Sequence, residues 1–399
     1  MLSLLATLLV APVLQDAAPD ADTQVTVYKA AKVYTADPDV GMVNNGLVVV
    51  QDGKIAWAGP ASGVEIEEGV EVVDLGRVWL VPGFLDPHNH VAGSLSDLND
   101  NVYLTNPEFR TVDLLEPQNP LLLDSVAGGV TTALLIPGSG SNMGGFGMVV
   151  KTSSKSIEDM IVRSPGSLKV AQSGNPERYS WGVRRAMMNW NTRNTLREGL
   201  EWAKAYKAGE APFDPRYEGF IGLETGTVHT QGMQVVMQTL VMQVQELGLK
   251  SFVDHGTFDG YLNAPLAAEL GVPVMNGPRH YFLDRATGQI FGTAARWLEA
   301  DVVLGYNTDS PVVPQEELPL QAAMGLRFGA GDLQDGIDGL TRNVALAMLV
   351  DDVCGSLMVG KDADFVAWDG DPIDPRSSVQ KVWVRGEQVY DIAEGRRRF

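Results

Sequence analysis

The chain has 399 residues, of which 45% are hydrophobic and 20% charged, so it is a globular protein large enough for one barrel-sized unit or two domains. Its net charge of −20 disfavours nucleic acid as a partner, because proteins bind phosphates through Lys and Arg. The single cysteine, Cys354, excludes an internal disulfide, and we expect it to be a small buried side chain rather than a nucleophile.

The first segment, residues 1–14, is apolar nearly throughout and precedes a polar, acidic stretch that extends to Gln24. It is too short to span a bilayer but has the length of a signal-peptide core. We therefore predict a signal peptide over residues 1–20, no membrane span, and export to the periplasm or the extracellular space. No lysine precedes Lys29 and no clear cleavage site is present, so a cytoplasmic protein with an apolar first helix or strand is the alternative.

Short β-type runs occur at both ends of the chain. Asp52-Gly53 lies between two of them and is a strong signal for a two-residue hairpin. We predict one small sheet domain built from both ends, residues 24–77 and 356–399.

The middle of the chain, residues 78–355, alternates apolar runs with helical segments, the longest being 181–208 and 233–247. Strands that alternate with helices predict parallel βαβ units, and the length fits an eight-stranded β/α barrel. A doubly wound open sheet is the alternative.

Potential metal ligands follow the predicted strands. His88 and His90 come after the apolar run 78–81, and their spacing of two residues places them on one side of a strand. His229, His255 and Asp309 each follow a later run. Because a barrel gathers its active site at the carboxyl ends of its strands, we expect the five side chains to converge. Imidazoles with a carboxylate suit zinc and similar divalent ions.

Four segments, VPGFLDPHNH (81–90), GGVTT (128–132), YNTDS (306–310) and GKDADF (360–365), resemble the signature segments of the metal-dependent amidohydrolase superfamily, in particular its imidazolonepropionase-like branch. The resemblance extends over about residues 25–390. It implies a distorted (β/α)8 TIM barrel with a small β-sandwich domain formed by both chain ends. It also implies hydrolysis of an amide, peptide or cyclic-amide C–N bond by a metal-activated water, without fixing the small-molecule substrate.

The resemblance further implies individual roles. His88 and His90 match the ligands of the first strand, His229 and His255 those of the fifth and sixth, and Asp309 the eighth-strand aspartate that binds metal and moves protons. In binuclear members a carboxylated lysine or a glutamate on the fourth strand bridges the metals. Lys169 in SLKVAQSG is the matching position, and Glu224 is the alternative. One or two Zn²⁺ ions are implied, with Mn²⁺, Fe²⁺ or Co²⁺ as alternatives.

Arg279 and His280 match no ligand position. Arg279 is suited to binding a substrate carboxylate, and His280 to orienting a substrate carbonyl or carboxylate as a further catalytic residue. A surface ion pair and a structural hydrogen bond are their respective alternatives. The sequence is compatible with a homo-oligomer.

Competing functions are a deaminase of the same superfamily and a non-catalytic secreted binding protein on the same barrel. A glycosidase would need two opposed carboxylates, and a serine hydrolase would need G-x-S-x-G, which is absent.

Overall fold

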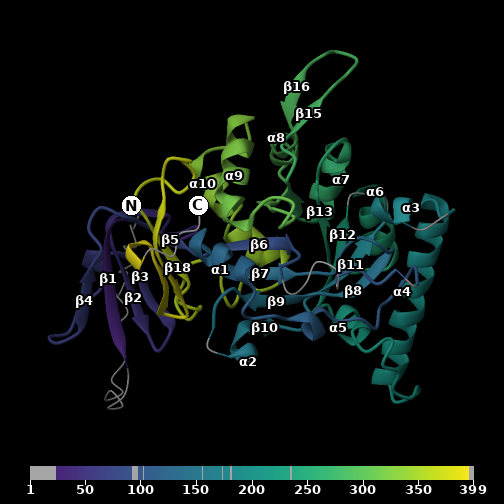
Figure 1. Cartoon of the computed structure of the whole chain (residues 1–399), viewed down its shortest axis with the longest axis horizontal. Coiled ribbons are helices and arrows are strands. Elements are labelled where there is room, and N and C mark those ends of the chain that lie inside the picture. The colour runs from purple at the N-terminus through teal and green to yellow at the C-terminus, as the bar shows by residue number, and fades with distance from the viewer. Residues whose placement is uncertain are drawn as a thin grey trace, which may run out of the picture.

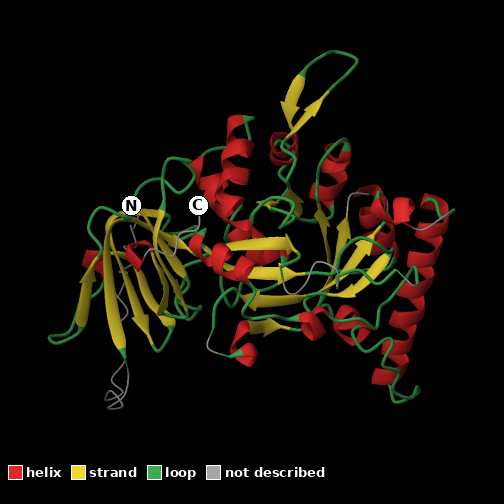
Figure 2. Ribbon diagram, viewed as in Figure 1, coloured by secondary structure: helices red, strands yellow, loops and turns green. Residues whose placement is uncertain are grey.

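The structure is a computed structural model that describes residues 24–91, 98–101, 103–154, 156–172, 174–179, 182–233 and 236–394. Within this part the strands form four sheets, accompanied by helices (Figures 1 and 2). The predicted signal peptide, residues 1–20, lies outside the described residues. Among the helices of the described part, none is both long and apolar enough to cross a membrane.

Both ends of the chain contribute to one eight-stranded sheet, ordered β20-β19-β18-β5-β1-β2-β3 with β4 beside β1. The predicted hairpin is present, since Asp52 and Gly53 connect β2 to β3 with φ angles of 50° and 77°, as a tight two-residue turn requires. The strands are β1 (Val25–Tyr34), β2 (Met42–Gln51), β3 (Lys54–Pro60), β4 (Glu71–Asp74), β5 (Trp79–Pro82), β18 (Phe365–Trp368), β19 (Val379–Val384) and β20 (Glu387–Asp391).

Two further sheets, ordered β10-β9-β7-β6 and β17-β14-β13-β12-β11-β8, come from the middle of the chain. Neighbours are parallel between β6 and β7 and from β11 through β17, whereas β8 and β9 run antiparallel to their partners β11 and β7. Their strands are β6 (Phe84–Asn89), β7 (Val130–Leu135), β8 (Met143–Phe146), β9 (Met148–Lys151), β10 (Ile161–Arg163), β11 (Ser167–Ala171), β12 (His229–Met233), β13 (Ser251–Asp254), β14 (Val274–Asn276) and β17 (Leu304–Tyr306).

An isolated parallel bridge between Asn89 and Ser310 brings the end of β6 beside the segment that follows β17. The parallel strands of the two middle sheets are almost entirely buried, as expected for strands covered on both faces. The predicted mixed α/β class is confirmed, whereas a closed barrel and a β-sandwich remain predictions. The fourth sheet is a hairpin of β15 (Tyr281–Leu283) and β16 (Ile290–Gly292), which projects at the top of Figure 1.

Some of the helices begin at side-chain caps. Asn119 accepts a hydrogen bond from the amide of Leu121 at the start of α1, and Asp332 and Asp335 form a reciprocal capping box at the start of α10. The helices are α1 (Pro120–Ala127), α2 (Ile157–Met160), α3 (Asn175–Tyr179), α4 (Arg185–Lys207), α5 (Phe220–Thr225), α6 (Val236–Gln238) continued by a π-helical segment (Thr239–Glu246), α7 (Ala264–Glu269), α8 (Thr293–Leu298), α9 (Leu318–Arg327), α10 (Leu333–Asp338) and α11 (Arg342–Ala347).

A buried ion cluster ties the terminal sheet to β9. The ammonium of Lys151 is fully buried and lies 2.5 Å from Asp364 Oδ2 and 3.0 Å from Asp362 Oδ2. Lys54 and Arg385 also contact Asp362, at 2.7 Å and 3.3 Å. Because a buried charge is tolerated only with close partners, the two aspartates of the GKDADF segment fix how the terminal sheet sits on β9.

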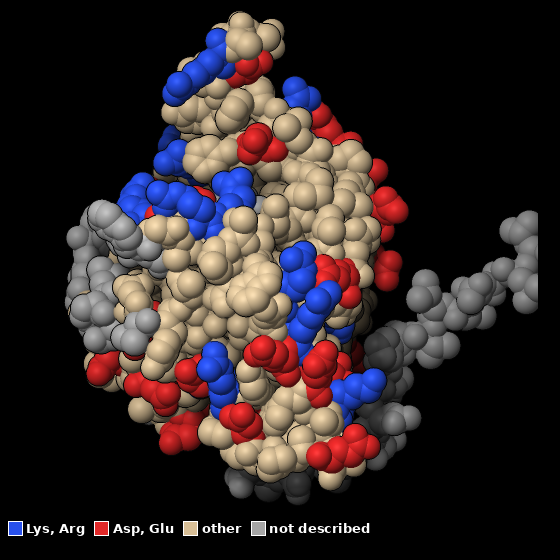
Figure 3. Space-filling view, turned by 90° about the vertical axis from the view of Figure 1, so that its right-hand side faces the viewer, with Lys and Arg blue, Asp and Glu red and all other residues tan. Residues whose placement is uncertain are grey.

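The excess of acidic residues is unevenly spread over the surface. On the face shown in Figure 3, Asp and Glu lie mainly along the lower part and the right-hand edge, whereas several Lys and Arg side chains gather at the upper left. Part of the positive charge is neutralised locally, since Arg193 and Arg197 of α4 both contact Glu246.

Candidate metal centre and active site

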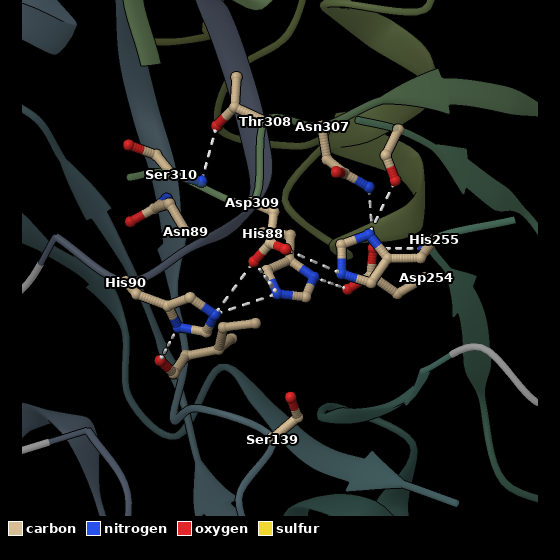
Figure 4. A network of polar contacts seen from close by, with 12 residues as sticks. His88, Asn89, His90, Ser139, Asp254, His255, Asn307, Thr308, Asp309 and Ser310 are labelled. Carbon is tan, nitrogen blue, oxygen red and sulfur yellow. Dashed lines mark hydrogen bonds and ion pairs between the residues drawn. The ribbon is translucent and has the colours of Figure 1, made fainter. Parts of the chain in front are cut away.

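The carboxyl ends of three strands bring together most of the predicted ligands (Figure 4). His88 lies on β6 with His90 directly after it, His255 directly follows β13, and Asp309 lies three residues beyond β17. Two overlapping groups of metal-binding side chains occur among the described residues. One comprises His88, His90 and Asp309, and the other comprises His88, Asp254 and His255.

The first group has the spacing of a tetrahedral metal site. His88 Nε2 lies 3.2 Å from His90 Nε2 and 3.2 Å from Asp309 Oδ1, and His90 Nε2 lies 3.3 Å from the same oxygen. Two ligands about 2 Å from a zinc ion at tetrahedral angles would be about 3.3 Å apart. The donor set therefore fits one zinc-like ion, and three protein ligands leave a coordination position for water.

The three imidazoles share one orientation. Nδ1 of His90 lies 2.9 Å from the carbonyl oxygen of Ile136, Nδ1 of His255 lies 2.8 Å from that of Gly277, and Nδ1 of His88 contacts the carboxylate of Asp254. Each Nδ1 thus faces an acceptor, which leaves each Nε2 lone pair free for a ligand. Nε2 of His255 lies 3.6 Å from Asp309 Oδ2, so it faces the same centre.

The protonation states suit metal binding. Burial lowers the pKa of His90 to about 4, against a smaller opposing effect of Asp309, and burial also lowers the pKa of His255. Burial would raise the pKa of Asp309, but His88 and the contacts with His88 and His90 outweigh it and lower that pKa below its ordinary range. Neutral imidazoles and an ionised carboxylate are the forms that bind a cation.

His88 differs from the other two imidazoles. Burial lowers its pKa, but the charges of Asp254 and Asp309 outweigh burial, so that the pKa is raised. Asp254 is itself buried, and although burial raises its pKa, His88 and His255 lower it to about 2. Asp254 is therefore an ionised carboxylate directly beside a ligand imidazole.

Two of these residues have an unusual backbone. His255 has a φ angle of 52° and Asp309 one of 54°, in the left-handed region that favours glycine. Such strain in residues other than glycine is concentrated at functional sites, where the surrounding structure holds it. The strain supports a functional role for both residues.

A cavity of about 350 Å³ opens at these ligands. Apart from the ligands, its described lining is uncharged, with Gly138 and Ser139 from the loop that follows β7. The full lining in the described part is His90, Leu98, Asn99, Gly138, Ser139, Asn175, Met233, His255, Asp309, Pro311 and Val312. This is the size of a small-molecule site.

Lys169 lies on β11 with its ammonium 3.2 Å from His88 Nε2. The side chain is fully buried, and burial lowers its pKa to about 8 against the opposing charges of Asp254 and Asp309. Lys169 therefore reaches the site as expected. Glu224 does not, because it lies on α5 and pairs with Lys207 of α4 at the surface, which excludes it as a bridging carboxylate.

The expectation that His229 ends a strand is wrong. The run from Phe220 forms α5, and His229 instead begins β12, where it pairs with Ser167 at the start of β11. Four residues of a strand separate it from Met233, which lines the cavity, and this corresponds to about 13 Å. The imidazole packs on Phe252, with 5.0 Å between ring centroids, and is absent from both ligand groups of the described residues.

We predict that His229→Leu will keep the metal content of the wild type. Both ring nitrogens are buried and have no hydrogen-bond partner in the described structure, and burial lowers the pKa of His229 well below 6.5. Below pH 6.5, the imidazole of His229 binds a proton in the unfolded chain but not in the folded protein. This difference costs up to about 1.4 kcal/mol of stability per pH unit. His229→Leu should therefore lose less stability than the wild type in denaturant titrations between pH 6.5 and pH 5. A loss of metal on substitution would show that His229 is a ligand.

Arg279 and His280 occupy different environments from those expected of substrate-binding residues. Arg279 is exposed, with its guanidinium 4.8 Å from the ring centre of Phe258. His280 is buried, and its Nε2 lies 2.5 Å from Gln321 Oε1. Neither is among the described residues that line the cavity, so the structural alternative is favoured for His280.

Three site residues were missed in the sequence. Asp254 precedes His255, Gln231 lies on β12, and Asn307 follows β17. The position of Asp254, next to a histidine at a strand end, was the one available signal. The two amides carry no motif, because neutral side chains at strand ends are common.

The mixed α/β fold groups imidazoles and a carboxylate at the carboxyl ends of parallel strands, an arrangement that could hold a metal ion. Comparison with known proteins supports the predicted resemblance. Residues 225–390 match the model of the amidohydrolase family. The chain is also similar to imidazolonepropionase of Cutibacterium acnes, with 26% identity over 86% of this chain and 90% of that protein.

Two more similar proteins support the same resemblance. The amidohydrolase tasK of Hapsidospora irregularis is 24% identical over 88% of this chain, which spans only 40% of that protein's length. A crystal structure of an amidohydrolase from Thermotoga maritima is 28% identical, with a TM-score of 0.81 over 92% of this chain and 100% of that one. These similarities support the predicted resemblance to the amidohydrolase superfamily and to its imidazolonepropionase-like branch.

Proposed function

We propose that this protein is an exported metal-dependent hydrolase that cleaves an amide, peptide or cyclic-amide C–N bond of a small molecule. The observation that carries the proposal is the grouping of His88, His90 and Asp309 with donor atoms 3.2–3.3 Å apart at the edge of a cavity. A distorted (β/α)8 barrel with a β-sandwich from both chain ends is the architecture that we propose around it.

His88, His90 and Asp309 would hold the ion, with His255 and Lys169 beside them. A bound zinc, manganese, iron or cobalt ion would lower the pKa of a water to about 7 and polarise the substrate carbonyl. Asp309 would accept the proton of the attacking water and deliver it to the departing amine, since its carboxylate lies at the edge of the cavity and is 23% exposed.

The uncharged part of the cavity lining favours substrates that present a neutral amide and a small apolar group at the reacting end. Arg279, being outside the described lining, would contact a substrate carboxylate only where the substrate extends beyond the cavity. Export remains part of the proposal on the basis of residues 1–14 alone. Finding residues 1–14 intact on the mature protein from its native host would contradict export.

We predict that removal of metal abolishes hydrolysis and that zinc or manganese restores it. The physical reason is that an ion held by these three pre-arranged ligands would supply the activated water. Elemental analysis of the purified protein, followed by a panel of dipeptides and cyclic amides before and after chelation, tests the proposal. A protein without metal and without turnover after metal addition would support the binding-protein alternative.

A further inference from the structure

Asp254 has every acceptor position in use. Its Oδ2 contacts His88 Nδ1 and accepts a hydrogen bond from Gln231 Nε2. Its Oδ1 accepts from the backbone amide of His255 at 2.9 Å and from Asn307 Nδ2 at 3.0 Å. Figure 4 shows the carboxylate of Asp254 among His88, His255 and Asn307, on the side of His88 away from His90.

The contact with Asp254 determines which nitrogen of His88 carries the proton. Both oxygens of Asp254 already accept hydrogen bonds from N–H groups, which leaves the carboxylate no proton to donate. His88 must therefore donate from Nδ1. The opposite nitrogen, Nε2, then carries a lone pair. Nε2 lies 3.2 Å from His90 Nε2 and 3.2 Å from Asp309 Oδ1. His90 and His255 use backbone carbonyl oxygens for the same purpose, and His88 alone uses a carboxylate.

Asp254 is in turn held by neutral amides. Gln231 is the strand partner of Lys169, so it occupies the position on β12 that faces the site, two residues beyond His229. Its side-chain amide also lies 3.4 Å from the carbonyl oxygen of Pro87, which fixes the amide so that its Nε2 faces Asp254. Asn307 donates from the opposite side, and its amide also lies 3.3 Å from the carbonyl oxygen of Met275.

We propose that Asp254 is a positioning residue that keeps His88 protonated on Nδ1 and aims its Nε2 at the metal position, with Gln231 and Asn307 holding the carboxylate in place. Asp254 is then not itself a ligand, although it belongs to a group of residues that could hold an ion. The inference rests on the proposed metal site but concerns the metal-free protein as well. A carboxylate that orients a ligand histidine typically contributes 10–100-fold to metal affinity.

The tautomer can be read directly by nitrogen NMR. The chain has only five histidines, so labelling histidine alone with ¹⁵N gives few signals, and the spectrum of His88→Gln identifies those of His88. We expect His88 of the metal-free wild type to carry its proton on Nδ1, and to keep that proton when zinc is added. A proton on Nε2 in the metal-free protein, or loss of the Nδ1 proton on adding zinc, would overturn the inference.

Metal affinity, measured by chelator competition with zinc, gives the second readout. Asp254→Asn should bind zinc 10–100-fold more weakly. An amide can also donate a hydrogen bond to Nδ1 of His88, so it no longer keeps the proton of His88 on that nitrogen. The matched control is Asp338→Asn, which removes another buried carboxylate, one that accepts a 2.9 Å hydrogen bond from Tyr34 outside the site. The control should lose stability but not affinity, and equal affinity losses in both variants would reduce Asp254 to a structural role.

A third variant keeps the inference testable if Asp254→Asn does not fold. Gln231→Met has a similar volume and removes one donor to Asp254, so it should weaken zinc binding by a few-fold and leave His88 with a mixture of tautomers. An unchanged tautomer and unchanged affinity in Gln231→Met would contradict the proposed support. If the wild type binds no zinc at all, the proposed function fails, whereas the tautomer of His88 still decides this inference.

Discussion

Asp309→Asn is expected to lower kcat by a factor of about 10²–10⁴, the range in which a positioned general acid or base contributes to catalysis. The carboxylate lies within 3.3 Å of two imidazole Nε2 atoms and lines the cavity, so it is the one acidic group in the described lining that can take a proton from an attacking water. An amide oxygen can still contact a cation but cannot accept that proton. Steady-state kinetics on an amide substrate found in the panel, together with metal analysis, measures the two effects separately.

Asp301→Asn is a matched control for this substitution. Asp301 is also an aspartate with a left-handed backbone, at a φ angle of 61°, but it is exposed and lies before β17 rather than after it. The control should have wild-type kcat, because asparagine tolerates this backbone conformation as aspartate does. If Asp309→Asn retained full activity with its metal, proton transfer would have to be assigned to another group.

Much of the fold was predictable because its signals are local. The Asp52-Gly53 turn requires positive φ angles that these two residues adopt readily, and the apolar runs near residues 131–136, 168–171 and 251–254 coincide with β7, β11 and β13. The antiparallel course of β8 and β9 was not predictable, since a short apolar run does not record the direction of its neighbour.

The site residues were predictable where an apolar run in the sequence identifies the end of a strand. His88 and His90 follow an unbroken apolar run, and His255 and Asp309 follow others, so period-two alternation and strand order place them. The prediction that His229 ends a strand failed because the residues before it form α5. A run with apolar residues at 220, 221 and 223 fits a short helix as well as a strand. The residue of β12 that faces the site is Gln231, a type that carries no metal signal by itself.

The residue of β12 that faces the site is the neutral Gln231, so this strand adds neither an imidazole nor a charge to it. The described ligands that surround the centre are three imidazoles and Asp309, which together supply a single negative charge. Asp254 adds a second negative charge behind His88, where it acts on the imidazole rather than on an ion. One dication is thereby balanced, whereas two would require a further anionic ligand.

Lys169 is the residue that could become that ligand, and Lys169→Ala is expected to halve the bound metal and to lower kcat on the order of a hundredfold or more, as loss of an electrostatic stabiliser does. A free ammonium 3.2 Å from His88 Nε2 would repel any cation bound there. Burial lowers the pKa of Lys169 to about 8, so near that pH much of the amine is uncharged and able to react with carbon dioxide. A carbamate formed there would replace one positive charge by one negative charge and would supply the further anionic ligand that a second ion requires.

Two further measurements make the test of Lys169 specific. Lys169→Glu keeps a carboxylate at the same strand position and should retain more metal than Lys169→Ala, because a glutamate can bridge two ions as a carbamate does. A short-chain carboxylic acid added to Lys169→Ala should restore part of the metal and activity by filling the space that the side chain leaves. If Lys169→Ala instead keeps both metal and activity, Lys169 is an ordinary buried lysine, and the single negative charge of Asp309 serves a site with one ion.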